Sequence, residues 1–155
     1  MKNLIEIYKA KLLKTLSAPS FSKQVNDLYL EIFKSWKNNR NIYICGNGGS
    51  AGNATHIAND FIYGAGIKNK KGLKIESLSA NPSIITCLAN DLGYEYIYSE
   101  QIKVKANEND LLIVLSGSGN SANVINALKI GNKLKMRTIA VIGFNGGKCL
   151  QIANK

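Results

Sequence analysis

Apolar residues recur at helical spacing through the first quarter of the chain. One set of apolar positions runs from Leu4 to Leu16, and a second, wider set runs from Phe21 to Trp36. Each set marks one face of an amphipathic helix, and Pro19 ends the first helix. Two long helices are therefore expected within residues 1–40. Their apolar faces either cover a sheet or pack against the same helices of another subunit.

After Asn41 the pattern changes to short apolar runs that alternate with helical stretches. The runs are residues 42–45, 74–78, 111–115 and 138–142, and the helical stretches are 50–63, 83–90, 97–105 and 121–134. Nearly continuous apolarity indicates strands that are buried on both faces. The βαβαβαβ order predicts an α/β fold, a three-layer, doubly wound parallel sheet of the flavodoxin-like kind. We expect residues 1–155 to form a single domain.

Two loops rich in glycine and serine follow the first and third predicted strands. The first is Gly46-Asn47-Gly48-Gly49-Ser50, and the second runs from Ser116 to Ser121 with three hydroxyls. Each loop opens a helix, whose N-terminal amides favour an anion. In a flavodoxin-like strand order the two loops meet at the switch point of the sheet, where ligands bind. The alternatives are a plain tight turn for the first loop and a simple helix cap for the second.

Neither loop matches a nucleotide-binding fingerprint. A dinucleotide-binding unit has an acidic residue at the end of its second strand, and this chain has none there. Neither loop ends in the Gly-Lys-Ser/Thr of a nucleotide-binding P-loop. A hydroxyl-rich cradle without lysine suits a sugar monophosphate. We therefore expect a phosphosugar ligand and no nucleotide cofactor.

Composition narrows the class of partner. The net charge is +10, but the lysines are spread over nearly every segment, so nucleic acid is not an expected partner. The charge can still help to attract an anionic substrate. No stretch approaches the roughly 20 apolar residues of a membrane span. Three well-separated cysteines favour reduced thiols in a cytoplasm over a disulfide framework or a zinc knuckle.

His56 and Asp60 stand four residues apart, so their side chains share one face of the predicted helix. The spacing suits acid–base chemistry or two ligands of one divalent metal, although a zinc site normally needs three or four ligands. A lone helical histidine is more often packed or solvated. Lys68, Lys70 and Lys71 either close over the sugar or form a solvated charged loop.

Three segments together resemble a known family. GNGGSAGNATHIANDF, CLANDLGYEYIYSEQ and LIVLSGSGNSANVINAL are similar to the successive motifs of the SIS (sugar isomerase) domain, and in particular to the phosphoheptose isomerase family. The resemblance covers nearly the whole chain. It implies a homotetramer in the bacterial cytoplasm that converts sedoheptulose 7-phosphate to D-glycero-D-manno-heptose 7-phosphate. The product supplies heptose for lipopolysaccharide or capsule.

The resemblance also implies roles for individual residues. It assigns substrate contacts to Asn47, Gly48, Gly49 and Ser50 in the first loop, to Ser116, Gly117, Ser118 and Ser121 in the second, and to Asn90 and Asp91. It makes Asp60 the catalytic base and assigns His56 and Asp60 to a zinc site. Without the resemblance, Asn90 and Asp91 indicate only a helix stop before Gly93.

The sequence departs from the family at two places. The family has glutamate where this chain has Asp60, and a base that is shorter by one methylene reaches less far. The family also continues with a further strand and a long helix, which carry a glutamine metal ligand and a catalytic histidine, whereas this chain stops at Lys155. The alternative hypothesis is therefore a noncatalytic SIS module that binds a phosphosugar or docks onto a protein partner.

Overall fold

The computed structural model describes residues 2–64 and 71–155. It forms two compact units, Met1–Lys34 and Ser35–Lys155. The expectation for Lys68 and Lys70 lies outside the described residues. No helix in the described ranges is both long and apolar enough to cross a membrane.

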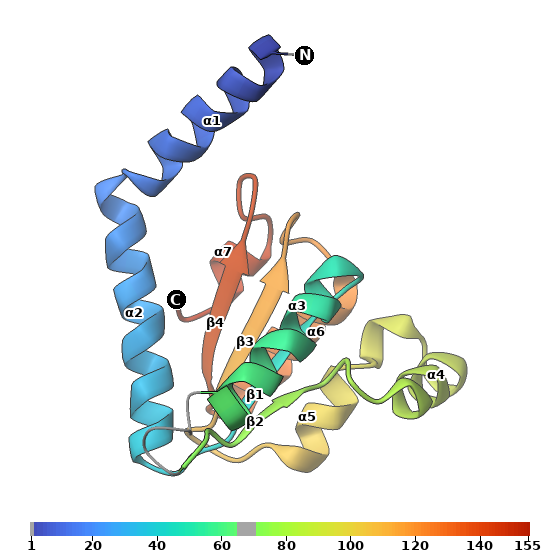
Figure 1. Ribbon diagram of the computed structural model, residues 1–155. Coiled ribbons are helices and arrows are strands. Elements are labelled where there is room, and N and C mark those ends of the chain that lie inside the picture. The colour runs from blue at the N-terminus through green and yellow to red at the C-terminus, as the bar shows by residue number, and fades with distance from the viewer. Residues whose placement is uncertain (1, 65–70) are drawn as a thin grey trace. The chain divides into compact units, whose positions relative to one another are not determined.

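The first unit holds α1 (Lys2–Leu16) and most of α2 (Pro19–Lys37) (Figure 1). Pro19 occupies the first position of α2, where its missing N–H costs no helical hydrogen bond. Within α2, the rings of Tyr29 and Phe33 stack with centroids 5.8 Å apart. The two predicted helices are thus confirmed, and Pro19 begins the second helix.

The second unit is an alternation of strands and helices. Its elements are β1 (Ile42–Gly46), α3 (Gly49–Asn59), β2 (Ile75–Ser77), α4 (Pro82–Asp91), α5 (Ser99–Lys105), β3 (Leu111–Ser116), α6 (Ala122–Lys133), β4 (Arg137–Ile142) and α7 (Cys149–Ile152). All four predicted strands are present. The predicted helix over 50–63 is α3 followed by a π-helical turn, Asp60–Gly64.

The four strands form one parallel sheet in the order β2-β1-β3-β4. Ile44 of β1 is in register with Ile113 of β3, which is in register with Ile139 of β4. Placing β1 beside β3 brings the carboxyl ends of these two strands together. The strand order confirms the predicted doubly wound sheet and its switch point.

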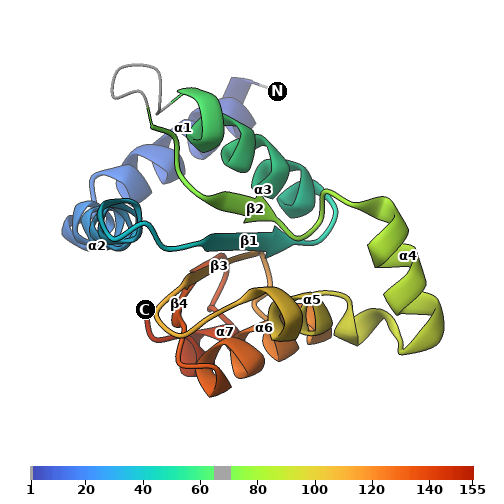
Figure 2. The same cartoon turned by 90° about the horizontal axis from the view of Figure 1, so that it is seen from below.

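Helices cover both faces of the sheet, which gives three layers. Figure 2 shows α3 on one face and α5, α6 and α7 on the other. Tyr43, Cys45, Leu112 and Val114 belong to the main core cluster, together with apolar residues of α5 and α6. Alternate positions such as Ile44 and Ile113 point to the α3 face. Burial on both faces explains the nearly continuous apolar runs in the sequence.

Candidate functional site

The first glycine-rich loop connects the end of β1 to the start of α3. Gly48 is the N-cap of α3, at φ 53° and ψ −121°, and no side-chain hydrogen bond caps the helix there. Ser50 N donates to Asn47 O at 3.0 Å, which closes the turn. The backbone therefore enters α3 through a tight turn whose N–H groups lie at a helix N-terminus, where an anion is stabilised.

The second loop connects the end of β3 to α6 and is organised by its own serines. Ser116 Oγ accepts a hydrogen bond from Gly119 N at 3.0 Å, and Ser118 Oγ accepts one from Asn120 N at 3.2 Å. Ser121 is the N-cap of α6, but its side chain makes no capping hydrogen bond. Its hydroxyl is thus not committed to capping the helix.

A third loop, residues 143–148, supports the second one. Gly143 N donates to Ser116 O at 3.2 Å and to Gly117 O at 3.1 Å. Cys149 N donates to Gly119 O at 3.0 Å, and Lys148 N donates to Asn120 Oδ1 at 3.0 Å. The sequence interpretation missed this support. The glycine pair 146–147 was a local turn signal, but the contact with the serine loop depends on the pairing of β3 with β4.

The two predicted loops wall the same cavity. A small cavity of about 90 Å³ is lined by Asn47, Ser50, Leu115, Ser116, Gly117, Ser118 and Ser121. A larger cavity of about 480 Å³ shares Ser50, Leu115, Ser116 and Gly117 with it, and is also lined by Asn53, His56, Ile57, Val141, Ile142 and Gly143. The shared residues make the two cavities adjoin. None of these residues is a lysine or an arginine, so the walls offer hydroxyl, amide and backbone donors.

His56 on α3 forms a pair with Asp60, the residue that directly follows this helix. His56 Nε2 lies 3.2 Å from Asp60 Oδ2, and the side chains are 76% and 63% exposed. His56 lines the larger cavity, whereas Asp60 is not among its lining residues. Asp60 begins the π-helical turn at the end of α3, and single π turns are frequent at functional sites. Of the two residues, His56 therefore contacts the larger cavity, and Asp60 lies beside His56.

The residues present do not complete a zinc site. His56 and Asp60 supply two donors, and zinc sites in proteins have three or four protein ligands. Within residues 2–64 and 71–155, no group of three histidine, cysteine, aspartate or glutamate side chains lies together. The donor set on α3 therefore does not fit zinc by itself.

Asn90 and Asp91 lie at the end of α4 and line neither cavity. Asn90 Nδ2 donates to Asp91 Oδ1 at 2.8 Å, and both side chains are exposed. The helix ends here, and Gly93 follows with φ 110°. The geometry agrees with a helix stop, and a sugar contact by these two residues stays a prediction.

A polar network behind the first loop was also missed from sequence. Tyr98 OH donates to Gly46 O at 2.5 Å and contacts Ser79 Oγ at 3.1 Å. Tyr94 OH donates to Asn47 Oδ1 at 3.1 Å, and the side chain of Asn123 forms two hydrogen bonds with that of Asn47. Burial raises the pKa of Tyr98 to about 12, so this hydroxyl remains a proton donor at neutral pH.

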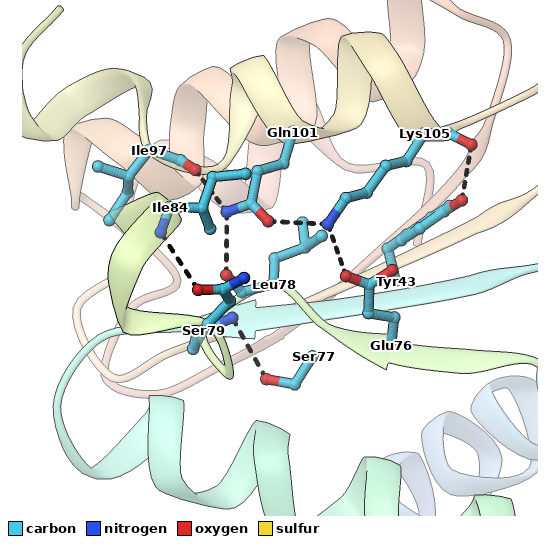
Figure 3. Close-up of polar contacts among 10 residues, drawn as sticks. Tyr43, Glu76, Ser77, Leu78, Ser79, Ile84, Ile97, Gln101 and Lys105 are labelled. Atoms are coloured by element: carbon cyan, nitrogen blue, oxygen red, sulfur yellow. Dashed lines mark hydrogen bonds and ion pairs between the residues drawn. The ribbon is translucent and has the colours of Figure 1, made fainter. Parts of the chain in front are cut away.

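Helix α5, which follows Tyr98, is anchored to the sheet by the contacts in Figure 3. Gln101 Nε2 donates to Leu78 O at 3.0 Å and to Ile97 O at 2.8 Å. Lys105 Nζ pairs with Glu76 at 2.6 Å, and Tyr43 OH donates to Lys105 O at 2.7 Å. These bonds fix both ends of α5 against β1 and β2. Tyr98, at the start of α5, is thereby held against the first loop.

The chain is similar to known proteins over most of its length. The family model described as "SIS domain" matches residues 8–143. A phosphoheptose isomerase from Aliarcobacter butzleri is 37% identical over 145 residues, which are 94% of this chain and 74% of the relative. One from Helicobacter pylori (strain P12) is 40% identical over 142 residues, which are 91% of this chain and 72% of the relative.

Solved structures of phosphoheptose isomerases are also similar to this chain. A phosphoheptose isomerase from Neisseria gonorrhoeae superposes with a TM-score of 0.79 at 31% identity, covering 99% of this chain and 78% of that one. One from Francisella tularensis gives a TM-score of 0.84 with the same coverages, but at 24% identity it supports the fold alone. The two Gly/Ser loops, the parallel sheet and these matches together show that the chain belongs to the SIS domain family and, within it, to the phosphoheptose isomerases.

Proposed function

We propose that this protein is a ketose–aldose isomerase that converts sedoheptulose 7-phosphate to D-glycero-D-manno-heptose 7-phosphate, for heptose and surface polysaccharide synthesis. The observation that carries the proposal is the joint cavity. The Gly/Ser loops that follow β1 and β3 line its small polar end, and His56 lines its larger end beside Asp60. Family membership at 37–40% identity supports the same activity.

The phosphate is proposed to bind at the small end of the cavity. Hydroxyls of Ser50, Ser116, Ser118 and Ser121 and the N-termini of α3 and α6 surround that end. Hydrogen bonds to a charged acceptor are about twice as strong as neutral ones, so several such donors can hold a phosphate monoester without a cation.

The length of α3 matches the length of the substrate. His56 follows Ser50 by six residues, or about 9 Å along the helix axis. An open-chain heptulose spans roughly 10 Å from its phosphate to C1, since C–C bonds are about 1.5 Å long. A phosphate beside Ser50 therefore places C1 and C2 near His56. Asp60 lies one turn further along the helix, and its carboxylate reaches back to His56 Nε2.

The proposed chemistry is proton transfer between neighbouring carbons. The ketose carbonyl at C2 acidifies the C1 hydrogens, and the Asp60 carboxylate removes one of them to leave an enediolate. Asp60 then returns the proton to C2 while the hydroxyl proton moves from O1 to O2 through the polar wall of the cavity. The imidazole of His56, whose Nε2 lies 3.2 Å from Asp60 Oδ2, stays beside the carboxylate throughout.

The test is turnover of sedoheptulose 7-phosphate by the purified protein, with the aldose product followed by NMR. A general base contributes about 10²- to 10⁴-fold, so Asp60→Asn should lower kcat by at least a hundredfold while phosphate binding is retained. Glu108→Gln is the matched control, because it removes one exposed carboxylate from the loop between α5 and β3. Wild-type protein that binds phosphosugars without turning them over would contradict the proposal and support a noncatalytic module.

Three further features of the proposal rest on the family resemblance. A homotetramer is proposed, and the exposed apolar side chains of α1, among them Leu4, Tyr8 and Leu13, are consistent with a subunit interface. Light scattering coupled to gel filtration would measure the subunit number. A cytoplasmic location is proposed as well. Zinc is a prediction from resemblance only, and because His56 and Asp60 supply two donors, the mechanism above uses no metal.

A further inference from the structure

Asn123 is a buried polar side chain in the first turn of α6. It is 1% exposed, and Val124, Ala127 and Leu128 of the same helix are also buried. Burying an amide is unfavourable unless its hydrogen bonds are satisfied. The hydrogen bonds of Asn123 join it to Asn47, 76 residues earlier in the chain. The pair therefore connects the β1 loop to the helix that follows the β3 loop.

The chemistry of the neighbours fixes which way each amide points. Val124 N, which can only donate, lies 2.9 Å from Asn123 Oδ1. Asn123 Oδ1 also accepts from Asn47 Nδ2 at 2.9 Å, so Asn123 Nδ2 must donate to Asn47 Oδ1, at 2.8 Å. Tyr94 OH donates to the same Asn47 oxygen at 3.1 Å. A helix amide thus determines, through Asn123, the orientation of Asn47.

This orientation decides what Asn47 offers to a ligand. Asn47 lines the small cavity, and its oxygen already accepts hydrogen bonds from Asn123 Nδ2 and Tyr94 OH. Its Nδ2 carries a second hydrogen that the bond to Asn123 does not use. A flipped amide would present an oxygen to the same cavity, and an oxygen repels a phosphate.

We propose that Asn123 is a positioning residue, which holds Asn47 so that an N–H and not a carbonyl oxygen serves the phosphate in the small cavity. Asn123 does so from behind the cavity wall and without touching the ligand. The inference rests on the proposed function, because it assumes that the small cavity binds the phosphate of the substrate.

The decisive variant is Asn123→Asp, which keeps the shape of the side chain and replaces its donor by a carboxylate oxygen. Val124 N can still donate to one oxygen, and the other then faces Asn47 Oδ1. Asn47 must rotate or move away. We expect the affinity for inorganic phosphate at pH 8, measured by ³¹P NMR titration, to fall about tenfold or more, as for one lost hydrogen bond to a charged acceptor.

Acidification should reverse the defect. A protonated Asp at position 123 carries an O–H that can donate to Asn47 Oδ1 as Asn123 Nδ2 does. The ratio of variant to wild-type affinity should therefore return to within about twofold as the pH falls from 8 toward 5, and taking the ratio removes the ionisation of phosphate itself. Asn126→Asp is the matched control. It adds the same charge to α6, where Asn126 bonds to Glu95 O, and should show neither the loss nor the recovery.

A second pair of variants separates positioning from general damage. Asn123→Leu removes the amide pair without burying a charge, and should weaken phosphate binding at every pH without recovery in acid. With Asn47→Ala in place, Asn123→Asp should have no further effect on phosphate affinity, because Asn47 is the residue through which it acts. If Asn123→Asp does not fold at pH 8, as judged by circular dichroism, the leucine variant decides, alone and combined with Asn47→Ala, where it should have no further effect on phosphate affinity.

The outcomes distinguish the two levels of proposal. Wild-type protein that fails to bind phosphate would overturn the proposed phosphate site. Wild-type protein that binds phosphate, together with Asn123 variants of unchanged affinity, would overturn the positioning role alone. The positioning role would also be overturned if Asn123→Asp lowered phosphate affinity equally in the wild-type and the Asn47→Ala backgrounds, since the effect would not then depend on Asn47.

Discussion

Replacement of Gly119 by alanine tests how tightly the loop between β3 and α6 is enclosed. Gly119 lies in the β3 loop at φ 64°, a conformation that costs an L-residue about 1–2 kcal/mol. A Cβ atom built there would lie 2.0 Å from Gly146 O and 2.6 Å from Gly146 C, both backbone atoms. Ordinary contacts exceed 3 Å, so the loop 143–148 must retreat by about 1 Å, further than packed backbone yields without loss.

That retreat also strains the hydrogen bond from Cys149 N to Gly119 O, now 3.0 Å. One such bond contributes about 1 kcal/mol net. Together with the torsional cost, Gly119→Ala should lower the free energy of unfolding by about 3 kcal/mol. The measurement is urea denaturation followed by circular dichroism, with an unchanged m-value as the sign that the unfolding reaction is the same. Phosphate affinity should fall as well, because Ser118 and Asn120 flank the displaced residue.

Two substitutions of the same kind serve as controls. Gly117→Ala, in the same loop, would place its Cβ no closer than 4.0 Å to Phe144, and its stability should change by less than about 0.5 kcal/mol. Gly52→Ala, inside α3 with open space around it, should stabilise the protein by about 0.5–1 kcal/mol. A Gly119→Ala variant as stable as Gly117→Ala would refute the steric reasoning.

Two further predictions concern stability. Burial, with smaller contributions from Asp110 and Glu76, raises the pKa of Tyr43 to about 12, and burial likewise raises that of Tyr98 to about 12. The stability that each raised tyrosine pKa implies is fully present below the unfolded pKa of about 10 and is lost as the pH rises toward 12. The free energy of unfolding should therefore fall by about 1.4 kcal/mol for each tyrosine by pH 11. Urea denaturation from pH 8 to 11 measures this, and Tyr98→Phe should show a smaller decline; an equal decline would contradict it. Asp110, 1% exposed, accepts hydrogen bonds from Asn41 N at 3.0 Å and Asn107 N at 2.9 Å. Asp110→Ala should therefore destabilise the fold by about 3 kcal/mol in the same assay, and a loss below 1 kcal/mol would show that these amides find other partners.

The sequence alone predicted the fold class and the two loops that line the small cavity. Apolar periodicity is a local property of the chain, and it indicated all four strands and both leading helices. The two Gly/Ser loops were recognisable because the features that hold an anion, glycine backbone, hydroxyls and helix N-termini, lie within a few consecutive residues. The strand order β2-β1-β3-β4 then brought the loops together as expected.

The rest was decided by tertiary structure, because it depends on contacts between distant segments. The pairing of Asn47 with Asn123 needs the register of β1 against β3, and the support of the serine loop by residues 143–148 needs that of β3 against β4. Neither has a local signature. Conversely, Asn90 and Asp91, assigned to the sugar by resemblance, lie on α4 outside both cavities. A one-dimensional pattern specifies which loops carry glycines, hydroxyls and helix N-termini, and only packing specifies which distant side chains contact those loops.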